Sequence, residues 1–310
     1  MTLTLPSFAK INWTLEVLGR RPDGYHELRT LLQTVSLGDE LRFEQRARGV
    51  EVVCDHPGVP RDETNLVARA AALLAERNGV ERGVRVEIVK RIPLAAGLGG
   101  GSSNAAVTLL ALMRLWGVRL APRDLFALGA RLGADVPFFF CGGTCLGVGR
   151  GDEVYPLAEM RAPRLLLVNA GVAVETREVY ANLPPELTNP RPAAMMPFTL
   201  EAAYRAMTEG ESFPQLAPQQ PPQQTMLWND LEGPVLARHP LLSEVRRRLA
   251  SAGAGAVLMS GSGATIFAIF DSEATLGAAH QEMTKAGWWC ARARTLDRVE
   301  YQAALSAARP

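Results

Sequence analysis

The chain has 310 residues, of which 47% are hydrophobic and 21% charged, as in globular proteins rather than disordered or fibrous ones. A chain of this length has room for two domains and buries enough surface to fold without metal or disulfide support. Because 33 Lys and Arg nearly balance 32 Asp and Glu, the protein has no net field to attract nucleic acid or an anionic membrane.

The N-terminal stretch MTLTLPSFAKINW lacks the basic start and apolar core of a signal peptide, and no run of about 18 apolar residues is present to span a bilayer. We therefore predict a cytoplasmic protein with no membrane or nucleic-acid partner. The four cysteines have no repeated CxxC spacing, so we expect reduced, packed thiols and no metal site built from protein ligands. The sequence makes no prediction of the oligomeric state.

The first part of the chain has the alternating pattern of strands. TLEVLGRR leads into a Pro-Asp-Gly turn at residues 22–24, and residues 40–45 and 49–55 alternate again, which predicts an antiparallel sheet. A helix follows and ends at Gly79, with Asp62 or Thr64 as its N-cap.

The rest of the chain alternates helices and strands. The patterns predict a strand at 84–88, a helix from about Ser103 to Trp116, a helix at 121–133, short strands up to 157, a buried strand at 164–171, two helical pieces between 229 and 254, two strands around 260–263, a helix at 272–288 and a closing strand. FPQLAPQQPPQQ, at about 213–224, cannot contribute a core, and we expect a surface loop there.

Residues 93–103, PLAAGLGGGSS, join the strand at 84–88 to the helix that follows. The first N–H groups of a helix are unpaired and carry a partial positive charge, so a loop at this place is suited to bind phosphate. Glycines let the backbone approach the anion closely, and Ser102 and Ser103 add hydroxyl donors. The loop alone leaves open a second interpretation, a tight turn that only packs a strand against a helix.

Two common nucleotide motifs do not fit this loop. A Walker loop needs a lysine after its last glycine, and no lysine lies between Lys90 and Lys285. A Rossmann fingerprint that starts at Gly97 and Gly99 needs its third glycine where Ser102 stands.

The loop PLAAGLGGGSSNAA resembles the phosphate-binding motif of the small-molecule kinases named for galactose, homoserine, mevalonate and phosphomevalonate, the GHMP kinases. Within that superfamily, FAKINWTLEVLGRRPDGYHELRTLLQTVSLGDEL is similar to the 4-diphosphocytidyl-2-C-methyl-D-erythritol kinases of the non-mevalonate (MEP) pathway to isoprenoid precursors. TNLVARAA, GADVPFF and SGSGATIF continue the resemblance in the expected order, so it covers nearly the whole chain.

The resemblance implies a two-domain α+β fold with the active site in the cleft between the domains. The N-terminal domain, placed at residues 1–160, would be like domain 2 of ribosomal protein S5. The C-terminal domain, placed at residues 161–310, would be ferredoxin-like and would contain the Pro/Gln-rich loop.

The reaction implied is transfer of the γ-phosphate of ATP to the 2-hydroxyl of the cytidine diphosphate alcohol. Lys10, in FAKIN, matches the lysine that the family places beside the acceptor hydroxyl, and Asp135, in GADVPFF, matches its catalytic aspartate. An ammonium favours an ionised carboxylate beside it, so the carboxylate could accept the hydroxyl proton. Mg²⁺ is implied as the ion carried by ATP, bound mostly through the phosphates.

The resemblance also assigns binding residues. ATP would be bound by Pro93, Leu94, Ala95, Ala96, Gly97, Leu98, Gly99, Gly100, Gly101, Ser102 and Ser103. Asn65 matches a position that the family places near the nucleotide, and the alternative is that a neighbouring residue caps the helix here. A third glycine motif is formed by Ser260, Gly261, Ser262 and Gly263. The small-molecule substrate would contact Asn12, Tyr25, His26, Thr176 and Tyr180, with Tyr25 and Tyr180 on the two sides of the base and His26 at its polar edge.

Two alternatives remain at this point. Another GHMP kinase would share the glycine loop but should lack the segment DGYHEL. A non-catalytic nucleotide-binding or RNA-associated protein would bind nucleotide without turnover, and the near-zero net charge and the joint presence of Lys10 and Asp135 count against it.

Overall fold

The computed structural model describes residues 2–188 and 227–307, and the predicted Pro/Gln-rich loop lies outside them. The described strands are β1 (Thr2–Arg20), β2 (His26–Arg46), β3 (Val50–Cys54), β4 (Gly83–Val89), β5 (Thr144–Gly149), β6 (Glu153–Pro156), β7 (Leu165–Asn169), β8 (Trp228–Asn229), β9 (Ala256–Met259), β10 (Ile266–Ile269) and β11 (Trp289–Ala293). The described helices are α1 (Leu66–Asn78), α2 (Gly100–Trp116), α3 (Pro122–Leu132), α4 (Phe138–Cys141), α5 (Thr176–Ala181), α6 (Pro185–Thr188), α8 (Glu232–Arg238), α9 (Pro240–Ser251), α10 (Glu273–Lys285) and α11 (Arg298–Ser306). None of these helices is long and apolar enough to cross a membrane.

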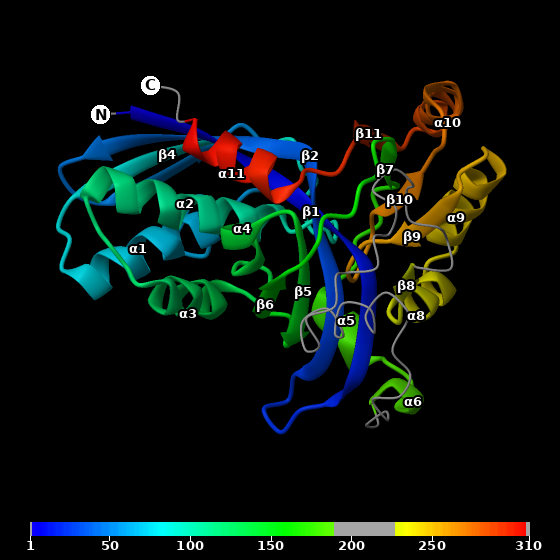
Figure 1. The fold of residues 1–310 in the computed structure, drawn as a ribbon, viewed down its shortest axis with the longest axis horizontal. Helices are drawn as coiled ribbons and strands as arrows, with labels where there is room; N and C mark the ends of the chain where they lie inside the picture. The colour runs from blue at the N-terminus through cyan, green and yellow to red at the C-terminus, as the bar shows by residue number, and fades with distance from the viewer. Residues whose placement is uncertain (1, 189–226, 308–310) are drawn as a thin grey trace.

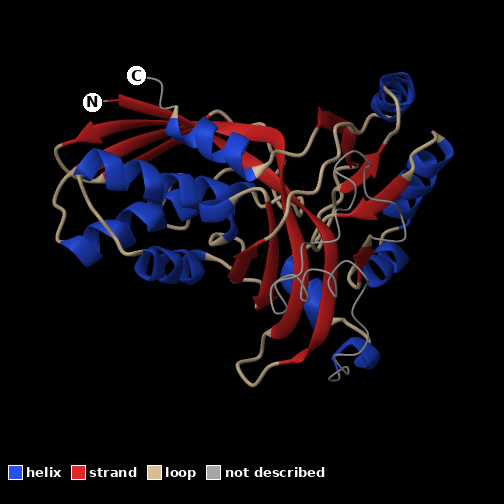
Figure 2. Ribbon diagram, viewed as in Figure 1, coloured by secondary structure: helices blue, strands red, loops and turns tan. Residues whose placement is uncertain are grey.

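The strands form two sheets (Figure 2). The larger has the order β3-β4-β2-β1-β8, with β5 paired to β2 and β6 to β5, and the smaller has the order β11-β7-β10-β9. Helices α1 to α4 lie along one face of the larger sheet, while α8, α9 and α10 flank the smaller one (Figure 1). This arrangement of two α+β halves agrees with the fold expected from the sequence.

The expected boundary after residue 160 falls in the connection between β6 and β7. Two later elements nevertheless return to the first half: β8 pairs with β1, and α11 packs its Tyr301 among the core residues of that half. The division into residues 1–160 and 161–310 therefore stays a prediction.

Strands β1 and β2 form a long antiparallel hairpin with its turn at the predicted residues 22–24. Gly24 has a left-handed φ of +85°, which suits glycine at a tight turn. The prediction that β3 continues an antiparallel sheet is wrong, because β3 pairs parallel to β4, which lies between β3 and β2. An alternating pattern indicates which face of a strand is buried but not which strand lies beside it.

Helix α1 has a different N-cap from either predicted one. Asn65 is the cap, and its side chain accepts a hydrogen bond from Val67 N at 2.8 Å. Asp62 Oδ1 is occupied instead by the N–H and the hydroxyl of Thr64. The end of the helix at Gly79, with φ of +61°, is as predicted.

Buried apolar side chains of the described residues form three groups. The first lies between the larger sheet and α1 to α3, and the second between the smaller sheet and α8 to α10. The third joins the two halves and includes Trp13, Leu98 and Phe267, with the Trp13 and Phe267 rings 5.5 Å apart and edge to face. Aromatic pairs of this geometry are worth about 0.5–1.5 kcal/mol beyond their burial, so the third cluster fixes the halves against each other.

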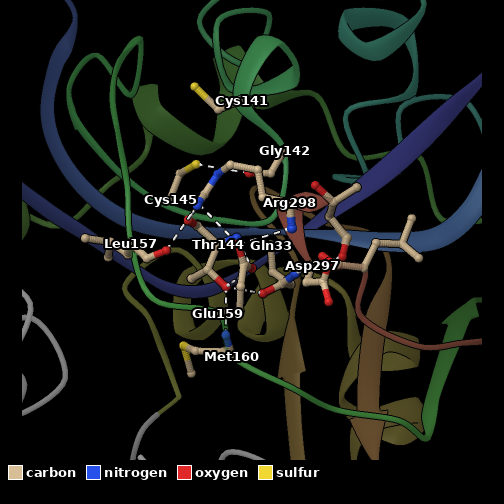
Figure 3. A network of polar contacts seen from close by, with 12 residues as sticks. Gln33, Cys141, Gly142, Thr144, Cys145, Leu157, Glu159, Met160, Asp297 and Arg298 are labelled. Carbon is tan, nitrogen blue, oxygen red and sulfur yellow. Dashed lines mark hydrogen bonds and ion pairs between the residues drawn. The ribbon is translucent and has the colours of Figure 1, made fainter. Parts of the chain in front are cut away.

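A polar network ties the start of α11 to β5 (Figure 3). Arg298 Nη2 donates to Thr144 O at 2.8 Å and to Leu157 O at 3.2 Å, and it lies 3.3 Å from Glu159 Oε1. Glu159 Oε2 accepts from Thr144 N at 2.9 Å, and the Thr144 hydroxyl donates to Gln33 Oε1 at 2.6 Å. Burial raises the pKa of the Glu159 carboxyl.

Candidate active site

The glycine loop ends in helix α2, which begins at Gly100 rather than at the predicted Ser103. Gly99 is the N-cap, with a left-handed φ of +68°. Within the described residues no acceptor meets the N–H groups of Gly100, Gly101 and Ser102, and the first bond of the helix runs from Ser103 N to Gly99 O at 2.8 Å. The unpaired donors and the positive end of the helix give this place an anion-binding geometry.

The side chains of the loop are divided between the core and the surface. Ala96 and Leu98 are buried in the cluster that joins the two halves, so only their backbone is available to a ligand. Ser103 is also buried, and its hydroxyl accepts a hydrogen bond from Ser7 Oγ at 2.7 Å. Of the two serines predicted to add hydroxyl donors, only Ser102 is partly open to solvent.

A buried ion pair fixes the entry to the loop. Lys90 Nζ lies 2.7 Å from Asp39 Oδ2, with 5% and 0% of the two side chains exposed. Asp39 Oδ1 accepts from the backbone N–H groups of Arg91 and Ile92, both at 2.8 Å. Both charges are thus paired and hydrogen-bonded, which is the condition for burying an ion pair. Residues 93–95 follow directly from this fixed point.

The glycine loop lies against the predicted third glycine motif. Ser260 Oγ donates to Gly97 O at 3.0 Å, and Thr265 N donates to Ala96 O at 3.2 Å. Gly97 has φ of +72°, and a Cβ atom there would lie 2.1 Å from Ser260 O and 2.9 Å from Gly263 O. Both obstacles are backbone atoms, so the close approach requires glycine. The two motifs, distant in sequence, form one backbone-lined surface.

The predicted catalytic pair is brought together beside this surface. Lys10 Nζ lies 3.5 Å from Asp135 Oδ2, and the two side chains are 4% and 37% exposed. Asn12 Oδ1 accepts from Lys10 Nζ at 2.8 Å, and Asn12 Nδ2 donates to Thr30 Oγ1 at 2.8 Å. The backbone joins β1 to the glycine loop, since Lys10 N donates to Leu98 O at 2.9 Å. The ammonium is therefore fixed, while the carboxylate is accessible.

The third glycine motif also approaches this pair. A Cβ atom at Gly261 would lie 3.2 Å from Lys10 Nζ and 3.4 Å from Asn12 Oδ1. The hydroxyls of Ser262 and Thr176 are hydrogen-bonded at 2.7 Å. Thr176 starts α5, so this bond joins the motif to the helix that carries the predicted aromatic contact.

The predicted base-binding residues lie at the far end of the β1–β2 hairpin. The rings of His26 and Tyr180 stack, with centroids 5.1 Å apart and planes at 27°. Tyr25 is 58% exposed, and Arg150 Cζ lies 5.2 Å from its ring centroid. Tyr180 thus stacks on His26 and not opposite Tyr25, and the base contacts of these residues stay a prediction.

Burial and local charge shift the pKa values of two of these rings. Burial, assisted by Arg20, lowers the pKa of His26, so its imidazole is neutral at pH 7 and can both donate and accept a hydrogen bond. Burial and then the charge of Asp135 raise the pKa of Tyr180. The second effect puts Tyr180 within electrostatic reach of Asp135, one of the two predicted catalytic residues.

Asn65 is occupied within the protein. Its Oδ1 accepts from Val67 N at 2.8 Å, and its Nδ2 donates to Pro60 O at 2.6 Å. The sequence left open a contact with the nucleotide or a helix cap formed by a neighbouring residue. The cap is Asn65 itself and not a neighbour, and a contact with the nucleotide stays a prediction. The neighbouring Leu66 does reach α2, because its Cδ1 lies 3.7 Å from where a Gly101 Cβ would be.

The cysteines and acidic side chains form no separate metal centre in the described parts of the chain, where no three His, Cys, Asp or Glu are grouped to hold an ion. All four cysteines are free thiols.

The chain is similar to known proteins over nearly its whole length. The family model for the GHMP kinases N terminal domain matches residues 65–143, and the model for the GHMP kinases C terminal domain matches residues 213–287. A 4-diphosphocytidyl-2-C-methyl-D-erythritol kinase from Citrifermentans bemidjiense is 41% identical over 95% of this chain and 99% of its own. The chain belongs to the 4-diphosphocytidyl-2-C-methyl-D-erythritol kinase family, within the GHMP kinases.

Solved structures agree with this family. A crystal structure of a 4-(cytidine 5'-diphospho)-2C-methyl-D-erythritol kinase is 37% identical, with a TM-score of 0.74 over 94% of this chain and 98% of that one. A homoserine kinase from Cytophaga hutchinsonii is 21% identical, with a TM-score of 0.65 over 95% of each chain, and this likeness shows the fold alone. As a member of the 4-diphosphocytidyl-2-C-methyl-D-erythritol kinase family, the protein is a small-molecule phosphotransferase of the two-domain GHMP type.

Several residues of the site were not identified from the sequence. Asp39 and Lys90 hold the entry to the loop, Arg150 covers the Tyr25 ring, and Asn229 contacts the third glycine motif. Each of these residues contacts a backbone group or a ring that comes near it only in the folded chain. Neither hydrophobic periodicity nor residue spacing in the sequence could therefore have identified it. The one available signal was the charge of Lys90 between a strand and the glycine loop, with Asp39 as a possible partner. The same sequence would equally suit an ion pair on the surface.

Proposed function

We propose that this protein transfers the γ-phosphate of ATP to the 2-hydroxyl of 4-diphosphocytidyl-2-C-methyl-D-erythritol, giving the 2-phosphate and ADP in the non-mevalonate isoprenoid pathway. One observation carries the chemistry: the Lys10–Asp135 pair lies beside a glycine loop whose first helical N–H groups are unpaired among the described residues. The names and the 35–42% identities of the relatives support the choice of substrate.

The start of α2 fits the phosphates of ATP. Three N–H donors at Gly100, Gly101 and Ser102 and the positive helix end would hold anionic oxygens in place before the reaction. Gly97 contacts Ser260, so the third glycine motif lies beside the glycine loop and lines the same surface. Mg²⁺ carried by the phosphates would neutralise part of their charge.

Asp135 and Lys10 supply the acid–base part of the reaction. Asp135 Oδ2 would accept the proton of the acceptor hydroxyl as the oxygen forms its bond to the γ-phosphorus and the bond to ADP breaks. Lys10 Nζ, held at 2.8 Å by Asn12, would stabilise the negative charge that develops on the oxygen atoms. The 37% exposure of the Asp135 side chain leaves room for the hydroxyl to reach it.

The cytidine diphosphate part would extend from this pair towards the end of the hairpin. Tyr25, His26 and Tyr180 offer ring faces for the base, and the neutral His26 can serve its polar edge. Thr176, bonded to Ser262, lies between the two ends. We also keep the inference of a cytoplasmic enzyme without nucleic-acid partners, which rests on the sequence.

The test is ADP release from Mg-ATP with 4-diphosphocytidyl-2-C-methyl-D-erythritol, run beside homoserine, mevalonate and galactose. We expect turnover of the first alcohol only, and a fall in kcat of about 10²–10⁴-fold for Asp135→Asn, the usual contribution of a general base. Asp124→Asn is the matched control, because Asp124 is a partly exposed carboxylate of α3 paired with Arg77. Activity on another alcohol alone, or undiminished activity of Asp135→Asn, would refute the proposal.

A further inference from the structure

The turn between β9 and β10 is the third glycine motif, and it has donors without partners. Among the described residues, no acceptor meets the N–H groups of Gly261 and Ser262. Gly261 has a left-handed φ of +58°, and its Cβ position lies 3.2 Å from Lys10 Nζ. The turn therefore carries two N–H groups without partners among the described residues and lies next to the Lys10 ammonium. These N–H groups can bind an oxygen atom of a reacting group only if the turn is held in place.

Asn229 holds this turn from outside the motif. Its Nδ2 donates to Met259 O and to Gly261 O, both at 2.8 Å, and its Oδ1 accepts from Leu231 N at 2.9 Å. These bonds use both amide hydrogens and fix the orientation of the amide, because only its oxygen can face an N–H group. The residue is 7% exposed, so water cannot readily replace the bonds.

The same segment is anchored on β1. Asn229 pairs with Leu15 in the parallel β1–β8 contact, and the following residue, Asp230, donates its N–H to Leu15 O at 2.9 Å. Asp230 Oδ2 accepts from Val17 N at 2.8 Å. Strand β1 belongs to the larger sheet and also carries Lys10, whereas β9 and β10 belong to the smaller sheet. Asn229 thus connects the strand of the catalytic lysine to the turn of the other sheet.

We propose that Asn229 is a positioning residue for phosphoryl transfer. Its amide donates a hydrogen bond to the Gly261 carbonyl oxygen and thereby sets the distance between the turn and Lys10. The N–H groups of Gly261 and Ser262 then remain available to bind the oxygen atoms of the reacting groups. This inference rests on the proposed kinase function. If the Asn229 amide had only a structural role, its replacement would lower stability and leave the catalytic rate unchanged.

The test compares Asn229→Asp and Asn229→Ala with Asn78→Asp. Aspartate keeps the acceptor for Leu231 N but replaces both donors with a negative oxygen, and alanine removes the donors without adding charge. Asn78 supplies the matched control, because its amide donates to Leu74 O at 2.9 Å at the end of α1, away from the turn. The measurements are kcat, KM for ATP and acceptor, and hydrogen exchange of the β9–β10 turn by mass spectrometry.

We expect faster exchange in both Asn229 variants at the hydrogen-bonded amides of the β9–β10 turn, those of Ser260, Gly263 and Thr265. Both variants should also lose roughly 10- to 100-fold in kcat, with each KM within about threefold of wild type. Asn78→Asp should show neither effect, even if it melts earlier. Faster exchange with unchanged kcat, or unchanged exchange, would overturn the inference. If the wild-type protein shows no turnover, the proposed function is refuted. The hydrogen-exchange result alone would then show whether Asn229 holds the turn in place.

Discussion

Replacing Gly97 by alanine should separate the two glycine motifs and slow phosphoryl transfer. The left-handed φ of +72° costs a residue with a side chain about 1–2 kcal/mol. The larger effect is steric, because the new Cβ would lie 2.1 Å from Ser260 O, where real Cβ contacts stay above 3.0 Å. Relieving this contact moves one backbone segment by about 0.9 Å, and a misplacement of about 1 Å near reacting groups costs on the order of 100-fold in rate.

Gly117→Ala serves as a control that separates the backbone strain of a left-handed φ from the steric clash of a Cβ atom. Gly117 closes the same helix with φ of +69°, and nothing lies within 4 Å of its Cβ position. It should therefore carry the backbone strain alone, with a Tm lowered by roughly 2–4 °C and a normal kcat. Calorimetry and ADP release measure the two effects. The steric explanation fails if Gly97→Ala turns over within about threefold of wild type, or if both variants lose the same activity.

Three further outcomes are expected. Asp39→Asn leaves the Lys90 ammonium buried without its counter-ion and should lower the free energy of unfolding in urea by about 3–5 kcal/mol, so an unchanged midpoint would contradict the role of the pair. Because the pKa of His26 is lowered from 6.5, the folded state resists protonation of this ring, and its contribution to stability is lost as the pH falls below 6.5. An NMR titration that puts the His26 pKa above 6.5 would show the opposite sign. Arg150→Ala removes a cation over Tyr25 worth about 0.5–1 kcal/mol and should raise KM for the acceptor about two- to fivefold, whereas a fall in kcat would contradict a role confined to binding.

The sequence predicted local structure well where the signal was local. The turn at residues 22–24, the end of α1 at Gly79 and the end of α2 at Gly117 follow from residues that favour those backbone conformations. The start of α2 was placed too late, because glycines at Gly100 and Gly101 favour a loop on propensity and become helical only through the surrounding contacts. The pairing of β3 with β4 depends on the whole sheet, and alternation contains no information on it.

The glycine loop was predicted from its glycines and its place before a helix, whereas the predicted catalytic pair depended on the resemblance, since no spacing rule relates Lys10 to Asp135. Other parts of the site could not have been found in this way. The stacking of His26 on Tyr180 depends on where α5 lies against β2, and the bonds of Asn229 depend on two sheets meeting. Side chains that act on backbone carbonyls leave no trace in hydrophobic patterning, so such residues appear only once the fold is known.

The position of α11 determines when the first half of the molecule can finish folding. Tyr301 is fully buried among residues of β1 to β4 and the first helices, its hydroxyl donates to Phe139 O at 2.6 Å, and the absence of a side chain at Gly142 makes room for its ring. During synthesis, this cavity stays open until the ribosome has released residues beyond 301, long after the rest of that half has emerged. The nascent N-terminal half therefore exposes apolar surface while the second half is being made, and its folding is expected to finish only after translation of α11.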